Sequence, residues 1–546
     1  MKTLNRIKRQ LYIVVLLIVG QSCSSGFLDE VPLSDYSTVG VLTSETGFEA
    51  YMTGLHKAAR DEMAARDGGR YFYIMASATD VADFGITALH SVDYNNLLTP
   101  AAAHVRQVWD WAYQDMFPLA NTIISYADDP DLADIWSSVE HKNAMIAEAK
   151  FFRAYTHNVL ANLYGGVPIA DTIYMTPKTD FLRNTREEVL QYARADLEFA
   201  SQWLPTTVEQ QGRIVKAAAD HLLTEVCISL GEYDLAVASA DKVINSGLYQ
   251  LMTERFGAKL AEPGDAFSDM FRDGNQNRNS GNLESIYVWQ FEDMTPGGQG
   301  GSNGNNRLRN WGPWIQRLTD PNGQAGMVRV DSLGTGTGQV RPTNYFLYDV
   351  WQDSWHNDMR NSVHNMRRVF HYTNPASAYF GQVVEPKTNP VDTMQNIYPY
   401  PRKIEGDVGT LTHTSSAWSG RTYQDFIVYR LAETYLLRAE AHFRMGDLQH
   451  AADDINVVRN RANATPIGAS DVTEDFILDE RARELITEEP RRRTLVRMGR
   501  LVDRVRRYSI REITANSIQE HHQWWPIPQS AIDANSSARL EQNLGY

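Results

Sequence analysis

The chain has 546 residues, of which 43% are hydrophobic and 22% charged, and this balance suits a globular protein with one or two sizeable cores. Its formal net charge of −15 argues against a nucleic acid as partner, because a phosphate-binding surface needs an excess of Lys and Arg. The 26 Tyr and 12 Trp exceed what a minimal helical core needs, which favours a surface that carries stacking platforms.

The first 22 residues predict an export signal that is removed and takes no part in the fold. A basic start precedes an apolar run from Leu11 to Val19, which is too short to span a bilayer. Cys23 follows closely, and this arrangement resembles a lipoprotein signal in which the cysteine becomes the lipidated first residue. The alternative is a plainly secreted protein with a chance cysteine. Cys227 is the only other thiol, so we expect it to be buried and the fold to lack an internal disulfide.

The next segments lead to a candidate binding loop. Residues 23–44 are polar and predict a tether, and residues 45–63 predict the first helix. Residues 71–98 mix short apolar and polar stretches, which predicts a loop with exposed side chains. Because loops of this kind commonly hold binding residues, we take as candidates Asp83, Phe84, His90 and Tyr94.

Apolar side chains at helical spacing predict three more helices in the first half. One carries Trp109, and Pro118 is expected to kink or restart it. The next ends at the two glycines that follow Leu163. A capping box of Thr185 and Glu188 opens the last.

Residues 216–247 predict a helical hairpin, around which the rest of the chain is organised. Apolar residues recur at helical spacing on both sides of Gly231, which indicates two short helices and a tight turn. The pattern returns 215 positions later, where Leu437, Ala441, Gly446, Ala451 and Val458 match Leu222, Val226, Gly231, Ala236 and Val243. Two copies indicate a repeat, and such hairpins stack into a solenoid because one alone cannot bury its inner faces.

The chain changes character between residues 257 and 426. GGQGGSNGNN has neither helix nor strand propensity, and SIYVWQF at residues 285–291 is the one clear strand candidate. A loop-rich insertion of this length is usually functional, because ordering it is entropically costly. Helices are expected to return at Ile427, with later ones at about residues 475–488 and 491–507 and an extended strap over residues 524–546. The expected division is thus a signal at 1–22, a tether at 23–44, a helical half at 45–256, the insertion at 257–426, and a helical repeat with strap at 427–546.

Several stretches at both ends and throughout the helical half together resemble the SusD/RagB family of outer-membrane lipoproteins. They include CSSGFLDEVP, AEAKFFRAYTHNVLANLYGGVPI, RLAETYLLRAEAHFRMGD, ILDERARELITEE and WWPIPQSAID. The resemblance implies a mainly α fold, in which tetratricopeptide-like helical hairpins support a large loop-rich insertion with few short strands. Leu448 and Leu544 depart from the family pattern, at positions where an aromatic residue and a proline are common.

The same resemblance implies a function. It predicts a protein lipidated at Cys23 and held on the outer membrane, facing the cell exterior. Such a protein captures an oligosaccharide or polysaccharide and hands it to a SusC-like TonB-dependent transporter, without catalysis and without a cofactor.

A sugar offers hydroxyl groups and a flat face of C–H bonds, so its site needs an aromatic ring and hydrogen-bonding side chains. The segment NNRLRNWGPW at residues 305–314 supplies both, with Trp311 and Trp314 beside Asn306, Arg307, Arg309 and Asn310. The alternative is that both indoles only anchor the insertion onto the helices. Trp289, Trp351 and Trp355 are expected to lie in the core.

Two other classes of function stay open. A helical-repeat protein would also serve as an adaptor for a peptide or protein ligand. A glycoside hydrolase would need a carboxylate pair, but Glu480 and Glu484 lie among arginines and predict solvated helix ion pairs. His521 and His522 have no Cys or carboxylate at ligand spacing, so we expect surface histidines and no metal site there.

Overall fold

The computed structural model describes residues 38–62, 75–85, 93–174, 176–292, 304–328, 336–385, 392–405 and 422–546, with residues 295, 297 and 298. Contacts divide the chain into two units, residues 1–51 and residues 52–546. The described part of the first unit holds α2 (Thr38–Val41) and the first turns of α3 (Glu45–Arg60), where a helix is predicted. The second unit holds all later elements. The predicted signal and Cys23 lie outside the described residues.

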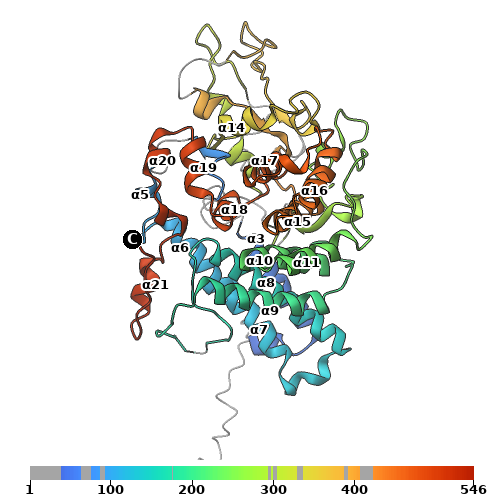
Figure 1. Ribbon diagram of the computed structural model, residues 1–546, viewed down its shortest axis with the longest axis vertical. Helices are drawn as coiled ribbons and strands as arrows, with labels where there is room; N and C mark the ends of the chain where they lie inside the picture. The colour runs from blue at the N-terminus through green and yellow to red at the C-terminus, as the bar shows by residue number, and fades with distance from the viewer. Residues whose placement is uncertain are drawn as a thin grey trace, which may run out of the picture. The chain divides into compact units, whose positions relative to one another are not determined.

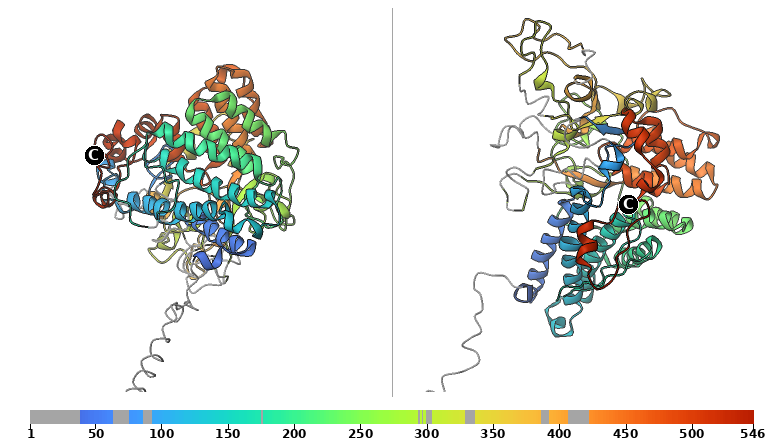
Figure 2. Two further views of the ribbon diagram at one scale, coloured as in Figure 1. Left: turned by 90° about the horizontal axis from the view of Figure 1, so that it is seen from below. Right: turned by 90° about the vertical axis from the view of Figure 1, so that its left-hand side faces the viewer.

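The long helices of the second unit lie side by side (Figures 1 and 2). In chain order they are α5 (Tyr94–Leu97), α6 (Ala103–Asp110), η2 (Trp111–Met116), α7 (Phe117–Ala127), η3 (Pro130–Ile135), α8 (Val139–Ala161), α9 (Arg186–Trp203), α10 (Lys216–Leu230), α11 (Tyr233–Ile244), α15 (Leu431–Arg444) and α16 (Leu448–Arg461). From α7 to α11 each α-helix packs on the next, and α11 packs on α15, which packs on α16. The mainly α, helical-repeat fold is therefore confirmed.

Both predicted hairpins are present, as α10–α11 and α15–α16. Gly231 and Gly446 stand in the two turns with φ of +78° and +81°, a backbone conformation that glycine adopts without strain. The matching apolar residues on the inner faces are buried in both copies. Cys227 is buried and unpaired, as expected for an inert core thiol.

The interruption expected at Pro118 takes the form of a π-helix. Proline has no N–H to donate to the preceding turn, so the regular hydrogen-bond ladder cannot pass through it. The backbone widens over η2 and then resumes as α7, which has Pro118 in its first turn. Trp109 and Tyr113 therefore stay on one continuous helical rod with Phe117.

Within the described residues, the strands of the insertion are short, and two of them pair with strands from outside it. β1 (Ala82–Phe84) pairs with β3 (Val340–Pro342), β2 (Ser285–Trp289) with β6 (Phe426–Arg430), and β4 (Met366–Arg367) with β5 (Tyr400–Pro401), all antiparallel. β2 coincides with the predicted strand, and Trp289 is buried. The helix predicted from Ile427 is wrong over its first residues, because Phe426, Ile427 and Tyr429 favour a strand and pair with β2.

Short helical turns connect these strands. They are α12 (Ala266–Asp269), η4 (Arg278–Ser280), α13 (Arg307–Trp311), η5 (Ile315–Arg317), α14 (Asn344–Leu347), η7 (Asp349–Trp351), η8 (Met359–Asn361), η9 (Asp392–Asn396) and η10 (Arg402–Ile404). Trp351 is buried as expected, whereas Trp355 is half-buried.

The C-terminal part returns over the helices. It contains η11 (Ala469–Asp471), α17 (Glu474–Leu485), α18 (Arg491–Arg497), α19 (Leu501–Tyr508), α20 (Glu512–Ser517), η12 (Glu520–Gln523) and α21 (Gln529–Ala534). The helix predicted over residues 491–507 is divided at Gly499, whose φ is +70°. The prediction of a fully extended strap is wrong over α21, a helix that begins directly after Pro528. His522, predicted at the surface, is buried because η12 packs on α19.

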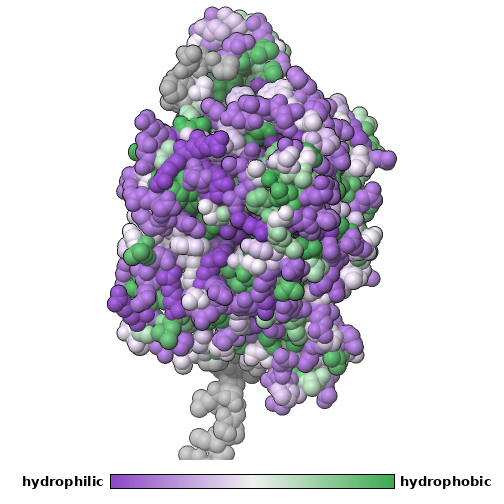
Figure 3. Space-filling view, viewed as in Figure 1, coloured by the Kyte–Doolittle hydropathy of each residue, from purple (hydrophilic) through white to green (hydrophobic). Residues whose placement is uncertain are grey.

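The helices and the surface of the described residues bear on whether this part of the chain could cross a membrane. None of the helices found there combines the length and the apolar character that crossing a membrane requires. The face in Figure 3 is largely hydrophilic, with small and scattered hydrophobic patches.

The carboxylates of Glu480 and Glu484 on α17 are fully buried, so the solvated ion pairs predicted for them are wrong. Glu484 accepts a hydrogen bond from Arg360 at 2.8 Å and further ones from Arg430 and Arg461. Glu480 also accepts from Arg360, at 2.8 Å. Arg483 of α17 does donate to Glu480 at 3.0 Å, but this pair is buried too. The prediction of solvated pairs failed because distant parts of the chain cover α17 and add these further arginines.

This buried ion array joins three parts of the fold. Arg360 belongs to the insertion, Arg430 ends β6 directly before the second hairpin, Arg461 belongs to that hairpin, and Glu484 to α17. Burial alone would raise the pKa of Glu484, but the three guanidinium groups outweigh it and hold this pKa well below its usual value. Lys403 adds a hydrogen bond of 2.8 Å to the Glu484 carbonyl. The insertion is thus fixed to the helices by charge pairs without access to water.

Replacing Glu484 by glutamine tests this array. The change keeps the shape but leaves buried guanidinium groups without their counter-charge, so we expect a loss of about 3–5 kcal/mol in the free energy of unfolding. Urea denaturation followed by circular dichroism measures it. The control is Glu198→Gln, because Glu198 pairs with Arg194 on the surface with its side chain 54% exposed. Glu198→Gln should lower the free energy of unfolding by at most about 0.5 kcal/mol. Equal losses in Glu484→Gln and Glu198→Gln would contradict the role of the array.

Candidate functional site

The two segments that the sequence singles out meet at β3. On one side β1 pairs with β3, and the Gly85 amide donates to the Gln339 carbonyl at 2.8 Å. On the other side the Thr337 amide donates to the Arg309 carbonyl at 2.9 Å, and the Gly338 amide to the Gly312 carbonyl at 2.8 Å. We call β1 with Gly85, residues 337–342 and residues 305–314 the β3 junction.

The two indoles at the β3 junction differ in exposure. Trp311 is 1% exposed and offers no ring face, which matches the alternative that it anchors the insertion. Trp314 is half-buried, and the guanidinium of the exposed Arg317 lies 3.4 Å from its ring centroid. Trp314 is therefore the ring of this pair that a ligand can reach.

Several polar atoms of α13 and its end are buried without a hydrogen bond to any described residue. They are both amide atoms of Asn310, the indole nitrogen of Trp311 and Nε of Arg307. Burial lowers the pKa of Arg307 to about 10. Leaving such a group unsatisfied costs about 1–3 kcal/mol, so the junction holds hydrogen-bonding capacity that bound water or a ligand would satisfy. Asn306 is buried and Arg309 half-buried.

The described candidates from residues 71–98 are buried, so the prediction of exposed side chains is wrong for them. Asp83 accepts hydrogen bonds from the Ser509 hydroxyl at 2.6 Å and the Ile510 amide at 2.9 Å. Phe84 and Tyr94 are 2% and 0% exposed. The reason is that this stretch packs against the C-terminal helices, whose contribution the local sequence does not reveal. His90 lies outside the described residues.

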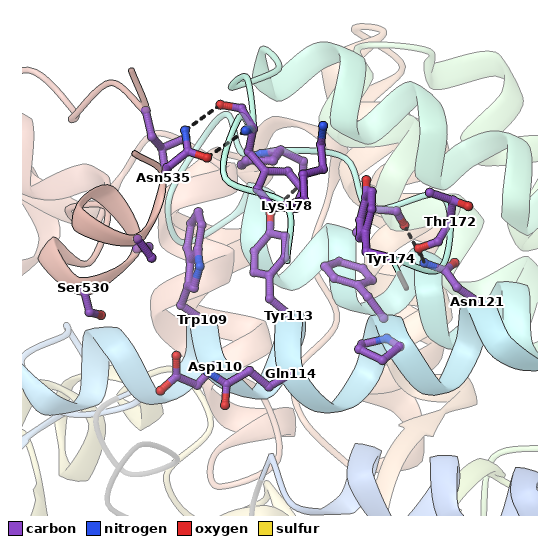
Figure 4. A pocket seen from close by; sticks show the side chains of 18 of the residues that line it. Trp109, Asp110, Tyr113, Gln114, Asn121, Thr172, Tyr174, Lys178, Ser530 and Asn535 are labelled. Carbon is purple, nitrogen blue, oxygen red and sulfur yellow. Dashed lines mark hydrogen bonds between the residues drawn. The ribbon is translucent and has the colours of Figure 1, made fainter. Parts of the chain in front are cut away.

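A second candidate is a groove of about 550 Å³ (Figure 4). Its floor is the rod formed by α6, η2 and α7, and its other walls are residues 168–181 and the region of α21. The walls are held together by Asn535, whose amide oxygen accepts from the Phe181 amide at 2.7 Å while its nitrogen donates to the Phe181 carbonyl at 2.9 Å. Two segments more than 350 positions apart thus form one binding surface.

Aromatic rings line this groove. Trp109 stacks on Tyr113 with centroids 4.6 Å apart, and the Tyr113 hydroxyl donates to the Pro168 carbonyl at 2.6 Å. Tyr174 is 41% exposed and meets Phe181 edge to face at 5.4 Å. Burial raises the pKa of Tyr113 well above its usual value, so its phenol is neutral at physiological pH. Exposed rings and amides of this kind suit a neutral ligand with an apolar face.

Sequence reasoning missed the groove. The spacing of Trp109 and Tyr113, four residues apart, indicates only an amphipathic helix, and nothing in the sequence pairs them with Tyr174. A signal was available in Tyr174 and Phe181, since both rings stand in a polar stretch without helical periodicity.

Comparison with known families gives a consistent result. A model described as the SusD family matches residues 340–546, and a model described as starch-binding proteins associating with the outer membrane matches residues 26–227. The chain belongs to the SusD/RagB family.

Individual relatives agree over different lengths. The starch-binding protein SusD of Bacteroides thetaiotaomicron is 40% identical over 124 residues, which are 22% of each chain. The SusD-like protein P2 of Formosa agariphila is 28% identical over 273 residues, 49% of this chain and 50% of that one. These two matches span half or less of the relatives' lengths. The SusD-like protein P25 of Formosa agariphila is 24% identical over 79% of this chain and 77% of its own.

Solved structures show the same fold. A protein described as a laminarin-binding SusD-like protein has a TM-score of 0.68 and 20% identity, covering 92% of this chain and all of its own. Surface glycan-binding protein A from Bacteroides thetaiotaomicron, in complex with laminarihexaose, has a TM-score of 0.68 and 19% identity over the same shares. The names of these relatives describe binding and not a reaction.

The buried Asp83 makes a pH-dependent prediction. Burial raises the pKa of its carboxyl to about 6, against 3.8 for an exposed group. A raised folded pKa means that the folded protein binds the proton more tightly, so stability is lost as pH rises from about 4 to 6. Asp83→Asn removes this loss, because asparagine carries no charge. We expect this variant to have a free energy of unfolding about 2 kcal/mol higher than that of the natural protein at pH 7.

Thermal or urea unfolding at pH 4 and pH 7 measures this difference. The matched control is Asp80→Asn, because Arg491 and Arg504 overcome the effect of burial and lower the pKa of Asp80 to about 2. Asp80→Asn should therefore destabilise at pH 7. A loss of stability in both variants at pH 7 would contradict the account of Asp83.

Proposed function

We propose that this protein is a cell-surface glycan-binding protein without catalytic activity. Membership of the SusD/RagB family carries the proposal, since its matched relatives are named for binding starch, laminarin or glycans. The buried state of Glu480 and Glu484 also removes the one carboxylate pair considered for hydrolysis from contact with a substrate.

The β3 junction is the glycan site in this proposal. Two segments more than 200 positions apart, each singled out for its residue types, are hydrogen-bonded to residues 337–342, one to β3 and the other to Thr337 and Gly338 just before it. Trp314 supplies a partly exposed ring, and Asn310 and Arg307 hold unsatisfied polar atoms close to it in sequence. A sugar needs this combination of an apolar face and hydrogen-bonding groups. Asn306 and Arg309 complete the described residues assigned to the site, and His90, a candidate from the sequence, lies outside the described residues.

Affinity electrophoresis against starch, laminarin and other polysaccharides tests this assignment. Trp314→Ala should weaken retention about tenfold, because a lost stacking contact is worth about 1 kcal/mol or slightly more. Phe380→Ala is the control, since Phe380 is 57% exposed and outside both candidate surfaces. Trp311→Ala is less informative, because removing a buried indole costs about 3–5 kcal/mol of stability.

The groove is the competing site, and Tyr174→Ala reports on it. If Tyr174→Ala loses retention by the polysaccharide and Trp314→Ala keeps it, the glycan site is the groove and not the β3 junction. Hydrolysis of a polysaccharide by the purified protein would overturn the proposal of a non-enzyme. Co-purified peptides without any glycan binding would favour the adaptor instead.

The proposal extends to location and partner. The match of residues 26–227 to proteins associating with the outer membrane supports a place on that membrane. In this proposal a lipid on Cys23 anchors the protein there. From there the protein would hand its ligand to a SusC-like TonB-dependent transporter. Cys23→Ser should release the protein into the soluble fraction, and pull-down of an outer-membrane barrel by the intact protein would identify the transporter.

A further inference from the structure

A cluster of three metal-binding side chains lies at the turn of the second hairpin. His442 stands in the last turn of α15, Asp447 precedes α16, and His450 stands in its first turn. One ligand atom from each lies within 4.8 Å of the other two. These residues form a H-x4-D-x2-H pattern, which sequence reasoning overlooked because it considered only His521 and His522.

The geometry of the cluster approaches that of a metal site. The distance from His442 Nδ1 to Asp447 Oδ2 is 3.8 Å, and that from His450 Nδ1 to the same oxygen is 2.6 Å. Ligand atoms about 2.1 Å from a tetrahedral zinc ion are about 3.4 Å apart. The closer pair must therefore separate by less than about 1 Å, and His450 is free to move because its side chain is 66% exposed.

The nitrogen of His442 that lies nearest Asp447 is available as a ligand. Its Nδ1 is buried and makes no hydrogen bond within the described residues, although the side chain as a whole is 14% exposed. A cation bound between the two side chains would give this nitrogen a partner.

Asp454 of α16 is already engaged by another side chain, because Arg438 donates to it at 2.6 Å. Arg438 also bonds to Asp241 of α11. Among the three candidate ligands Asp447 is the carboxylate, and its negative charge favours a cation.

We propose that His442, Asp447 and His450 bind a divalent cation of the zinc class and thereby clamp the two helices of this hairpin together. Two imidazoles and one carboxylate favour Zn²⁺ and its neighbours, whereas Ca²⁺ and Mg²⁺ prefer oxygen ligands. The exposed side of the cluster leaves the fourth position to water. This site is independent of the proposed glycan function, because its residues belong to neither candidate surface.

Isothermal titration of the chelator-treated, untagged protein with ZnCl₂ tests the site. We expect one equivalent to bind, and His450→Ala to weaken that binding at least tenfold. Asp447→Asn is the sharper variant, because asparagine caps a helix as well as aspartate does but is a poorer metal ligand. His356→Ala is the control, since His356 is exposed and far along the chain in the insertion.

Two outcomes overturn the proposal. One is the absence of stoichiometric binding at up to about 0.1 mM Zn²⁺, which would leave only a helix cap with an ion pair. The other is zinc binding that both His450→Ala and Asp447→Asn leave unchanged. His450 is exposed and Asp447 half-buried in the turn, so correct folding is expected and can be verified by circular dichroism. MgCl₂ and CaCl₂ at the same concentration should give no heat of binding.

Discussion

The buried ion array around α17 is the constraint on which the arrangement of the chain depends. Charged groups without water are costly unless each finds a partner with good geometry. Glu484 meets this condition because Arg360, Arg430 and Arg461 all reach α17. Because these arginines come from the insertion and the second hairpin, one set of pairs determines how the loop-rich part lies on the helices. A hydrophobic core would hold the same parts together but would tolerate more positions, since it has no directional contacts.

The candidate surfaces follow from this attachment. β1 reaches β3 only because the insertion is fixed, and the hydrogen bonds of Thr337 and Gly338 then carry residues 305–314 to the same place. The groove has a different origin, since its floor is the widened helix at Pro118 and its clasp is Asn535. One fold therefore presents two candidate binding surfaces, the groove lined by aromatic rings and the β3 junction with Trp314. Because different residues form them, variants of Tyr174 and Trp314 distinguish the two. The cluster at the second hairpin turn lies apart from both.

Local pattern was sufficient for the elements with a strong signal of their own. Helical spacing, the glycines of both hairpin turns and the capping box of Thr185 and Glu188 each depend on neighbours in sequence, and the structure has them where predicted. The family resemblance, carried by quoted motifs, gave the fold class. Ile427 was misassigned because pairing with β2, which is remote in sequence, overrides its local context. The burial of Asp83, Phe84 and Tyr94 was missed for the same reason, since their covering helices lie some 400 positions later. Spacing brought Trp311 and Trp314 to attention but contained no information on which indole faces the solvent.

The distribution of the ion array over the chain also limits how such a protein can diversify. An insertion that varies freely would be expected to travel between relatives as a module. Here the segment carries Arg360 and Lys403, whose counter-charges Glu484 and Glu488 stay behind on α17 and directly after it. A transplanted insertion without these two cations would leave carboxylates stranded in the host. New ligand specificity must therefore arise through changes at the tips of the loops, while their bases keep the same basic residues.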